Sequence, residues 1–285
     1  MMKKPIKPVN CKVIWAMWLQ GVLNAPYIVQ RCLKSWEEKN LSWQLIVLDE
    51  KNVSEYLDLN DITKKNSDLI SKQAFSDIVR INLLNKYGGV WVDATCLCLK
   101  PLDDWIYSYL QDGFFAFDRP GIDRPIASWF LASASDCYLT NKYCEEVNHY
   151  WTARRFSNQD NAIGRWINSK IQSRMQHIPC DSQEFTLLFN LTKWARFCPY
   201  YWFHYLFSQI LNTDKACYEA WNRTMKLSAD IPHKAQRIGL SNLMDDSIKE
   251  QLDILAAPLY KLTWRIQDAA YDRGTVLNYI LNKQN

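Results

Sequence analysis

The stretch SKQAFSDIVRINLLNKYGGVWVDATCLC, residues 71–98, decides the fold. Its first part places Phe75, Val79 and Leu83 at intervals of four residues. Apolar side chains at that interval lie on one face of a helix, so the stretch predicts an amphipathic α-helix over 71–89.

Two glycines and an apolar run follow this helix. Gly88 comes two residues after Lys86, where a residue of positive φ commonly ends a helix. The run VWVDATCLCL, residues 90–99, predicts a buried strand. Asp93 interrupts it, and because an unpaired buried carboxylate costs several kcal/mol, we expect that side chain to have a partner or a task.

The preceding sequence supplies the other parts of an α/β pattern. Residues 11–18 and 43–50 predict strands, and 25–39 predict a helix between them. The order strand, helix, strand, helix, strand favours a parallel sheet. Residues 113–119 and 127–134 are further strand candidates.

The sequence becomes helical after about residue 135. Asp181 and Glu184 form a capping signal for one helix. The helices predicted in this part cover 185–197, roughly 201–211, and a segment after Thr213.

We therefore expect an α/β core over 1–135. A helical region over 136–285 should pack on the same core, as one continuous domain. The chain has 285 residues, enough for a substantial core.

Composition excludes several classes of protein. Hydrophobic residues make up 48% of the chain and charged residues 22%, which indicates a globular protein. A net charge of +4 is too small to require nucleic acid, but it suits an anionic small ligand or an acidic membrane surface. No apolar run approaches 18 residues, so no transmembrane helix is predicted.

The start of the chain, MMKKPIKPVNCKVIW, predicts no signal peptide. The 9 cysteines are scattered without a CxxC pair. Their odd number and the missing export signal favour reduced thiols in a cytoplasm.

Simple geometry brings three charged residues together. Asp77 lies ten residues before Tyr87, about 15 Å along a helix. The strand from Val90 to Asp93 runs back about 13 Å, so the two carboxylates should reach a similar height. Arg80 lies one turn after Asp77, near the end of a parallel strand, where open α/β sheets bind ligands. Alternatively, Asp77 and Arg80 form a surface pair and backbone donors satisfy Asp93.

The segment SDIVRINLLNKYGGVWVDAT, residues 76–95, closely resembles the core signature of the capsular polysaccharide synthesis family. That family is related to the glycosyltransferases of family 32, which carry a DxD motif, and more distantly to the clostridial glucosylating toxins. Weaker resemblances, in the family's order, lie at 13–36, 127–133, 203–211 and 258–265.

The resemblance implies a glycosyltransferase A-type fold, with a Rossmann-like, mainly parallel sheet and a helical C-terminal part. It implies that the α/β core, 1–135, binds the nucleotide sugar and that the helical region, 136–285, lies on the acceptor side. It implies a retaining hexosyltransferase that uses a nucleotide-diphosphate sugar, of the UDP type, to extend a capsular or O-antigen glycan. The acceptor could be lipid-linked. We expect a cytoplasmic enzyme, with peripheral contact at the inner face of the cytoplasmic membrane as an option, and no nucleic-acid partner.

The same resemblance assigns roles to residues. Asp77 and Arg80 match the pair that holds sugar hydroxyls, and Asp93 matches the first acid of DxD. Trp18 matches, less securely, the aromatic residue that stacks on the uracil. The predicted catalytic residues are Asp93, Asp77 and Arg80, and the predicted donor-binding residues are these three with Trp18, Gln20 and Lys261.

One departure affects the expected cofactor, Mn²⁺ or Mg²⁺. Thr95 stands where DxD has its second acid, and a hydroxyl is a weaker ligand than a carboxylate. The predicted metal ligands are Asp93 and Thr95, with Asp118, Asp103 or a C-terminal side chain to complete the site. Lys261 is the alternative partner for the phosphates.

Other residues keep two interpretations each. Two histidines, His204 and His233, are candidates for a functional role. His204 is either a core histidine or an acceptor contact. The aromatic stretch 200–207 is either core or, with Lys193 and Arg196 before it, an interfacial surface. Asp49 either touches the nucleotide or caps a turn.

Two other functions compete with transfer. Thr95 is compatible with a catalytically silent subunit that binds a sugar nucleotide. A nucleotidyltransferase would want a loop rich in glycine and lysine near the first strand, and WLQGVLNAP, residues 18–26, is not such a loop.

Overall fold

The computed structural model describes residues 12–153, 156, 162–254 and 257–282. The start of the chain, for which no signal peptide is predicted, lies mostly outside these residues. The strands are β1 (Val13–Met17), β2 (Gln44–Leu48), β3 (Gly89–Val92), β4 (Cys96–Cys98), β5 (Phe114–Gly121), β6 (Arg124–Ser133) and β7 (Leu259–Lys261). The helices are α1 (Tyr27–Lys39), α2 (Val53–Tyr56), α3 (Asn60–Thr63), α4 (Lys72–Tyr87), α5 (Ile106–Tyr109), α6 (Tyr138–Ala153), α7 (Ala162–Met175), α8 (Gln183–Trp194), α9 (Trp202–Thr213), α10 (Lys215–Arg223), α11 (Asp230–Ile238), α12 (Asp246–Ile254) and α13 (Val276–Asn282).

The central sheet has the strand order β2-β1-β3-β6-β5. β1 pairs in parallel with both β2 and β3, which confirms the α/β class. β6 runs antiparallel to β3 and to β5. Only two residues connect β5 to β6, too few for the crossover that a parallel pair needs, so this hairpin extends the sheet with antiparallel strands.

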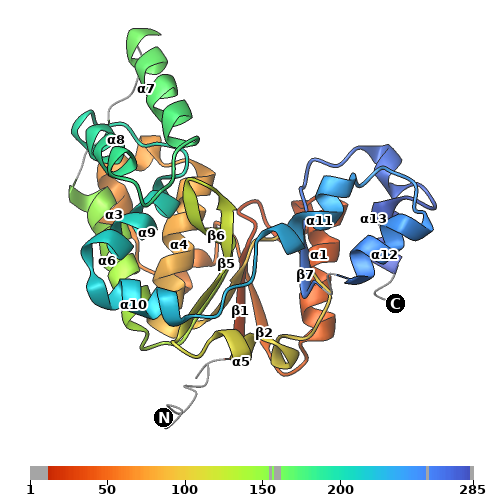
Figure 1. Ribbon diagram of the computed structural model, residues 1–285. Helices are drawn as coiled ribbons and strands as arrows, with labels where there is room; N and C mark the ends of the chain where they lie inside the picture. Colours follow the sequence, from red (N-terminus) through yellow and green to blue (C-terminus); the bar gives the residue numbers. More distant parts are fainter. Residues whose placement is uncertain (1–11, 154–155, 157–161, 255–256, 283–285) are drawn as a thin grey trace.

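Helices cover both faces of the sheet (Figure 1), because alternate residues of each strand face opposite layers. Ile14 and Ala16 of β1 pack in one core with α1 and α13, whereas Val13, Trp15 and Met17 pack in the other core with α4, α6 and α9. One face of the sheet is covered by α1, and on the same side lie β7 with its partner β4 and the helices α11 to α13.

The two glycines after α4 have separate tasks. Gly88 ends the helix with a φ of 70°, and its N–H donates to the carbonyl of Leu84, so the predicted positive φ is confirmed. Gly89 has a φ of 93°, and a Cβ at this position would lie 2.5 Å from the carbonyl oxygen of Val13. Glycine is therefore what lets β3 approach β1 at this point.

The single strand predicted over 90–99 is wrong. β3 ends at Val92, the chain turns, and β4 begins at Cys96 in a separate two-stranded sheet with β7. The turn is closed by the N–H of Cys96, which donates to the carbonyl of Asp93 at 2.9 Å. Asp93 therefore lies just past the end of a buried strand and not inside one.

The helical C-terminal part agrees with the prediction, since α8, α9 and α10 cover the expected segments. The capping signal is shifted by one residue. Ser182, in extended conformation, accepts a hydrogen bond from the N–H of Phe185, whereas Glu184 pairs with Arg174. Within the described residues, no helix is both long and apolar enough to cross a membrane. The boundary near residue 135 stays a prediction.

Candidate active site

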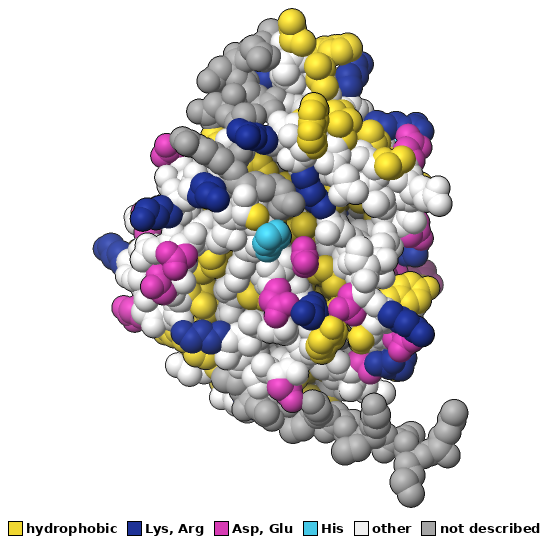
Figure 2. Space-filling view, turned by 90° about the vertical axis from the view of Figure 1, so that its left-hand side faces the viewer, with side chains coloured by type: hydrophobic (Ala, Val, Ile, Leu, Met, Phe, Trp, Pro, Cys, Tyr) yellow, Lys and Arg dark blue, Asp and Glu magenta, His cyan; other side chains and the backbone are white. Residues whose placement is uncertain are grey.

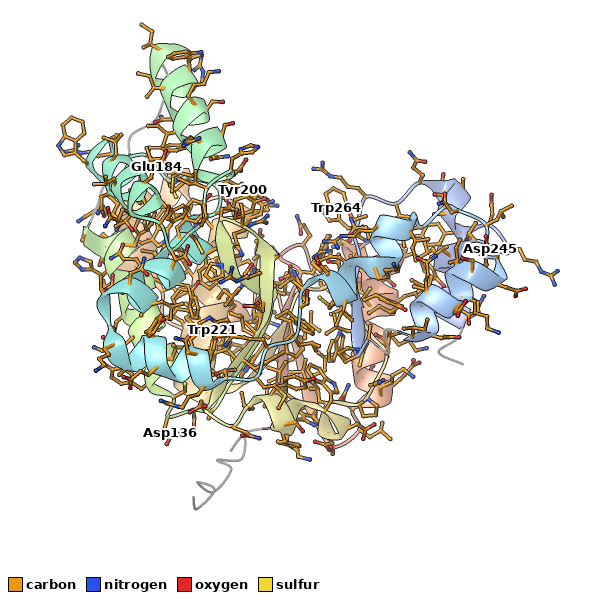
Figure 3. The ribbon with its side chains drawn as sticks, in the orientation of Figure 1. Asp136, Glu184, Tyr200, Trp221, Asp245 and Trp264 are labelled. Carbon is orange, nitrogen blue, oxygen red and sulfur yellow. The ribbon has the colours of Figure 1, made fainter. Side chains whose placement is uncertain are left out.

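A cleft of about 1030 Å³ opens where β1 and β3 end. Residues after these strands form its floor, and its walls come from α4, β6 and the start of α9 on one side and from α11 and β7 on the other. Tyr200 and Trp264 stand on opposite sides of the opening and point toward it (Figure 3). All predicted site residues line this cleft: Trp18, Gln20, Asp77, Arg80, Asp93, Thr95 and Lys261.

Arg80 bridges the two carboxylates. Its guanidinium lies 3.1 Å from Oδ1 of Asp77, one helical turn earlier on α4, and 3.4 Å from Oδ1 of Asp93. Arg80 is only 5% exposed, so the alternative of a surface pair is wrong. The structure places both carboxylates and the arginine at one point, as the spacing predicts.

Arg80 is also held by neutral groups. Its Nη1 donates to the carbonyl of Ser128 at 2.7 Å, and its Nη2 donates to Oγ of Ser76 at 3.0 Å. The guanidinium carbon lies 5.0 Å from the ring centre of Trp91, close enough for a cation–π interaction. Because so many groups hold it, the guanidinium is fixed before any ligand binds.

Asp93 lies between two cations. Lys261 Nζ is 3.7 Å from Oδ2, on the side away from Arg80, and the indole N–H of Trp91 donates to Oδ1. Burial acts to raise the pKa of Asp93, but Arg80 and Lys261 outweigh it and the pKa is lowered. The carboxylate is therefore ionised at neutral pH, and with 29% of its side chain exposed it is open to a ligand.

Asp77 has the opposite electrostatic behaviour. Burial raises its pKa to about 7, Arg80 partly counters this, and the charge of Asp93 adds to the rise. Near neutral pH the carboxyl group therefore exists in both protonation states. It can donate a hydrogen bond to a ligand or accept one from a hydroxyl.

Thr95 and Lys261 meet although they lie 166 residues apart. β7 pairs with β4 so that Lys261 stands opposite Cys96, and the N–H of Leu262 donates to the carbonyl of Thr95. Lys261 Nζ then donates to Oγ1 of Thr95 at 2.6 Å and to the carbonyl of Leu262 at 3.2 Å. The Thr95 hydroxyl thus already accepts from an ammonium group.

This donor set does not fit a divalent cation. Both predicted ligands, Asp93 and Thr95, contact Lys261, so a metal ion on them would lie beside a positive charge. The described residues contain no group of three or more metal-ligating side chains. Asp103 bonds instead to Lys12, and neither it nor Asp118 lines the cleft. The predicted Mn²⁺ or Mg²⁺ stays untested, and the geometry does not favour it.

The structure shows where His204, the stretch 200–207 and Asp49 lie relative to the cleft. His204 lines the cleft, nearly buried, and burial and Arg124 lower its pKa to about 3, so it is neutral. Within 200–207, Trp202 to Phe207 are buried, which makes this segment core. Asp49 caps a turn, since its Oδ1 accepts from two backbone N–H groups and the residue does not line the cleft.

Sequence reasoning missed several cleft residues. Arg124 pairs with Asp123 at 3.1 Å and lies over the ring of Tyr201 at 4.1 Å. Trp129 packs against the edge of His233, with ring centres 5.6 Å apart. Arg124 belongs to no motif with a recognisable spacing, so the sequence held no signal for it. Trp129 lies within the weaker resemblance at 127–133, which assigned it no role.

The charge of the cleft favours an anionic ligand. Two acidic residues, Asp77 and Asp93, line it. Five basic residues line it as well: Lys72, Arg80, Arg124, Arg237 and Lys261. With aromatic rings at its edges, the cleft offers positive charge, hydroxyl acceptors and stacking surfaces in one place.

Comparison with known proteins gives similar relatives. The chain is 26% identical to O-glycosyltransferase braB of Annulohypoxylon truncatum over 159 residues, which cover 49% of this chain and 38% of that protein. It is 31% identical to glycosyltransferase afumC of Aspergillus fumigatus (strain CBS 144.89 / FGSC A1163 / CEA10) over 122 residues, 39% of this chain and 31% of that protein. The matches thus span less than half the length of these relatives.

A solved structure, the PaToxG glycosyltransferase, has 14% sequence identity and a TM-score of 0.40, with 87% of this chain and 86% of that chain covered. The model of the capsular polysaccharide synthesis protein family matches residues 2–157 and 137–280, which together span nearly the whole chain. The resemblance predicted from residues 76–95 is therefore confirmed, and this chain belongs to the capsular polysaccharide synthesis protein family.

Proposed function

We propose that the chain is a glycosyltransferase that moves a sugar from a nucleotide-diphosphate sugar, of the UDP type, to a glycan acceptor. The observation that carries this proposal is Arg80, which bridges Asp77 and Asp93 in a cleft lined by cationic and aromatic side chains. The names of the relatives support the same class of reaction.

Each part of a nucleotide sugar has a partner of suitable chemistry. Sugar hydroxyls can donate to Asp77 and Asp93, which Arg80 holds in place. The ring of Trp18 offers a face to the base, with Gln20 beside it at the opening. A cleft of about 1030 Å³ lies at the upper end of ligand-pocket volumes, so it leaves room for part of an acceptor as well.

We propose that transfer retains the configuration at the anomeric carbon. The bond from that carbon to the phosphate oxygen breaks, and the acceptor oxygen bonds to it from the same face. The acceptor's proton passes to the departing oxygen, so the products are a nucleoside diphosphate and a longer glycan. The protein contributes orientation and electrostatic stabilisation to this substitution.

The acceptor we propose is a capsular or O-antigen glycan carried on a lipid. A surface near the cleft supports this choice. α7 stands out from the body of the molecule, and hydrophobic and basic side chains gather over this upper end (Figures 1 and 2). The exposed large hydrophobic side chains of α7 and α8 are Ile163, Trp166, Ile167, Leu187, Leu191 and Trp194, which we call the α7–α8 surface.

The α7–α8 surface suits an anionic bilayer. Trp166 is 63% exposed and Trp194 83%, and the stretch 162–196 holds five basic and two acidic residues. Gln172 of α7 accepts a hydrogen bond from the N–H of Tyr200 at the edge of the cleft, so a docked α7 would bring the cleft close to lipid headgroups. The proposed location is therefore the cytoplasmic face of a membrane.

Vesicle sedimentation tests this location. The protein should sediment with vesicles that contain phosphatidylglycerol and much less with phosphatidylcholine alone. Trp166→Ala combined with Trp194→Ala should abolish binding, whereas Leu41→Ala, which removes an exposed leucine elsewhere, should not. Equal binding by the double variant would exclude this surface.

A thermal-shift panel of nucleotide sugars tests the main proposal. A true donor at 100 times its Kd should stabilise the protein by about 2.7 kcal/mol. Release of free nucleoside diphosphate upon adding acceptor would separate a transferase from a silent binding subunit. Release of pyrophosphate from a nucleoside triphosphate would instead indicate a nucleotidyltransferase. No response to any nucleotide sugar would exclude the proposal.

A further inference from the structure

We propose that Lys261 takes the place of a divalent cation, so that this chain binds the donor's diphosphate and supports its departure without a metal ion. The proposal rests on the proposed function and names the group that carries one step of it. It is argued from the contacts of Lys261, Thr95 and Asp93.

The first argument is position. Lys261 Nζ lies 2.6 Å from Oγ1 of Thr95 and 3.7 Å from Oδ2 of Asp93, the two groups that would otherwise ligate a cation. An ammonium group in hydrogen-bond contact with one prospective ligand and ion-paired with the other occupies the electrostatic role of the metal. A second, doubly charged cation at the same point would be repelled.

The second argument is preorganisation. Two features of the backbone fix Lys261: the pairing of β4 with β7, and the hydrogen bond from the N–H of Leu262 to the carbonyl of Thr95. Thr95 therefore positions the lysine in two ways: its carbonyl accepts from the N–H of the next residue, Leu262, and its hydroxyl accepts from the Lys261 ammonium group. A charge fixed before the reaction needs little reorganisation as negative charge develops, which is the condition for strong electrostatic stabilisation.

The third argument is the chemistry of Thr95 itself. A hydroxyl accepts a hydrogen bond from an ammonium group as readily as from other donors, whereas a carboxylate would form a full ion pair with it. With threonine in place of the acid, the lysine keeps part of its charge for a ligand. The departure from DxD at this position thus complements a lysine 166 residues away.

The step that Lys261 serves is the breaking of the sugar–phosphate bond. The departing oxygen gains negative charge as that bond breaks and later takes the acceptor's proton. Lys261 donates a hydrogen bond to the diphosphate and neutralises part of this charge. Trp264, three residues after Lys261, lines the same cleft.

Calorimetry with UDP, and with GDP in parallel, tests the proposal without any transfer reaction. Wild-type protein should bind one of them with equal affinity in EDTA and in Mn²⁺. Lys261→Met should weaken that binding by about 10- to 100-fold, and Lys261→Arg should recover part of it. Binding of the matching nucleoside, which lacks phosphate, should not change.

Two further variants test whether the loss of affinity is specific to Lys261. Thr95→Val removes the hydroxyl that holds the ammonium and should cost less affinity than Lys261→Met. Lys249→Met, which removes an exposed lysine of α12, should leave affinity unchanged. Transfer activity of the wild type in EDTA should stay within about twofold of its value in Mn²⁺.

The outcomes separate this proposal from the proposed function. If UDP or GDP binds only with Mn²⁺, or if Lys261→Met binds as well as the wild type, Lys261 does not replace a metal, yet the proposed transferase function remains. If neither nucleotide binds under any condition, the proposed function fails, and this proposal fails with it.

Discussion

In each wall of the cleft, charged and polar side chains contact one another, but the residues that meet lie at very different separations along the chain in the two walls. On one wall, which we call the near wall, Asp77, Arg80 and Asp93 come from a single helix–turn–strand unit. On the other, the far wall, Thr95 meets Lys261 from 166 residues away. The near wall fixes a buried cation between carboxylates. The far wall leaves a partly exposed cation beside a hydroxyl.

This difference separates Arg80, a cation held by protein groups, from Lys261, a cation that can still contact a ligand. Arg80 has its hydrogen bonds directed at protein groups, including the carbonyl of Ser128 and the hydroxyl of Ser76. Lys261 donates to one hydroxyl and one carbonyl, and its nearest carboxylate is 3.7 Å away. We therefore expect the loss of Arg80 to affect folding and the loss of Lys261 to affect phosphate binding.

The largest effect should follow from Arg80→Met. The change leaves the mostly buried Asp77 and the partly exposed Asp93 without their shared cation, and removing one partner of a buried ion pair typically costs about 3–5 kcal/mol. Urea denaturation measures this loss. Arg174→Met, which breaks the exposed pair with Glu184, should cost less than about 1 kcal/mol. Similar small losses in both variants would show that the near wall does not carry the stability assigned to it.

The next effect is a dependence of stability on pH that Asp77 causes. Its pKa is about 7 in the folded protein and near 3.8 when unfolded, so the folded protein binds more protons between these values. Stability from this group is fully present below pH 3.8 and is lost as pH rises through about 7. A difference of this size corresponds to roughly 4 kcal/mol at most.

Asp77→Asn measures this contribution. The free energy of unfolding of the wild type, minus that of the variant, should fall between pH 4 and 7 and stay level above about pH 7.5. Asp93 acts in the opposite sense at lower pH, because its lowered pKa gives stability that is lost as pH falls below about 4. A difference that is flat from pH 4 to 8 would mean that Asp77 is not protonated near neutrality.

The near wall could be predicted from the sequence because local geometry determines it. A helix of known rise, a glycine turn and a short strand return Asp93 to the height of Asp77, whatever the rest of the chain does. The same reasoning was wrong about where the strand ends. It extended the strand to residue 99, whereas β3 ends at Val92 and a new strand, β4, begins at Cys96 and pairs with β7 from the other end of the chain.

The far wall could therefore be predicted only from the family resemblance. The resemblance pointed to Lys261 but did not predict which side chains it contacts. The predicted metal ligands illustrate the limit. Asp93 and Thr95 have the spacing of a metal motif, but spacing cannot reveal that an ammonium group lies against both. Arg124 and Trp129 were missed for the same reason, since β6 brings them to the cleft through tertiary contacts alone.

Asp93→Asn tests the point where the walls meet. Arg80 keeps Asp77 and its neutral partners in this variant, so the melting temperature should change little. Turnover should fall by about 10²–10³, the usual cost of losing a preorganised electrostatic group. A large loss of stability with normal turnover would place Asp93 in the structural near wall alone.

The smallest effect we predict concerns Trp18, which follows β1 and packs edge-to-face with Trp264 at 6.4 Å between ring centres. If its ring stacks on the base, Trp18→Ala should weaken binding by about 1–3 kcal/mol, and by the same amount for a nucleoside and for its diphosphate. Variants of Lys261 should weaken only the diphosphate, so calorimetry with both ligands separates base recognition from phosphate recognition. Trp264→Ala is the matched control, since it removes the neighbouring indole and should cost less. Unchanged affinity for both ligands in a folded Trp18→Ala protein would exclude the stacking role.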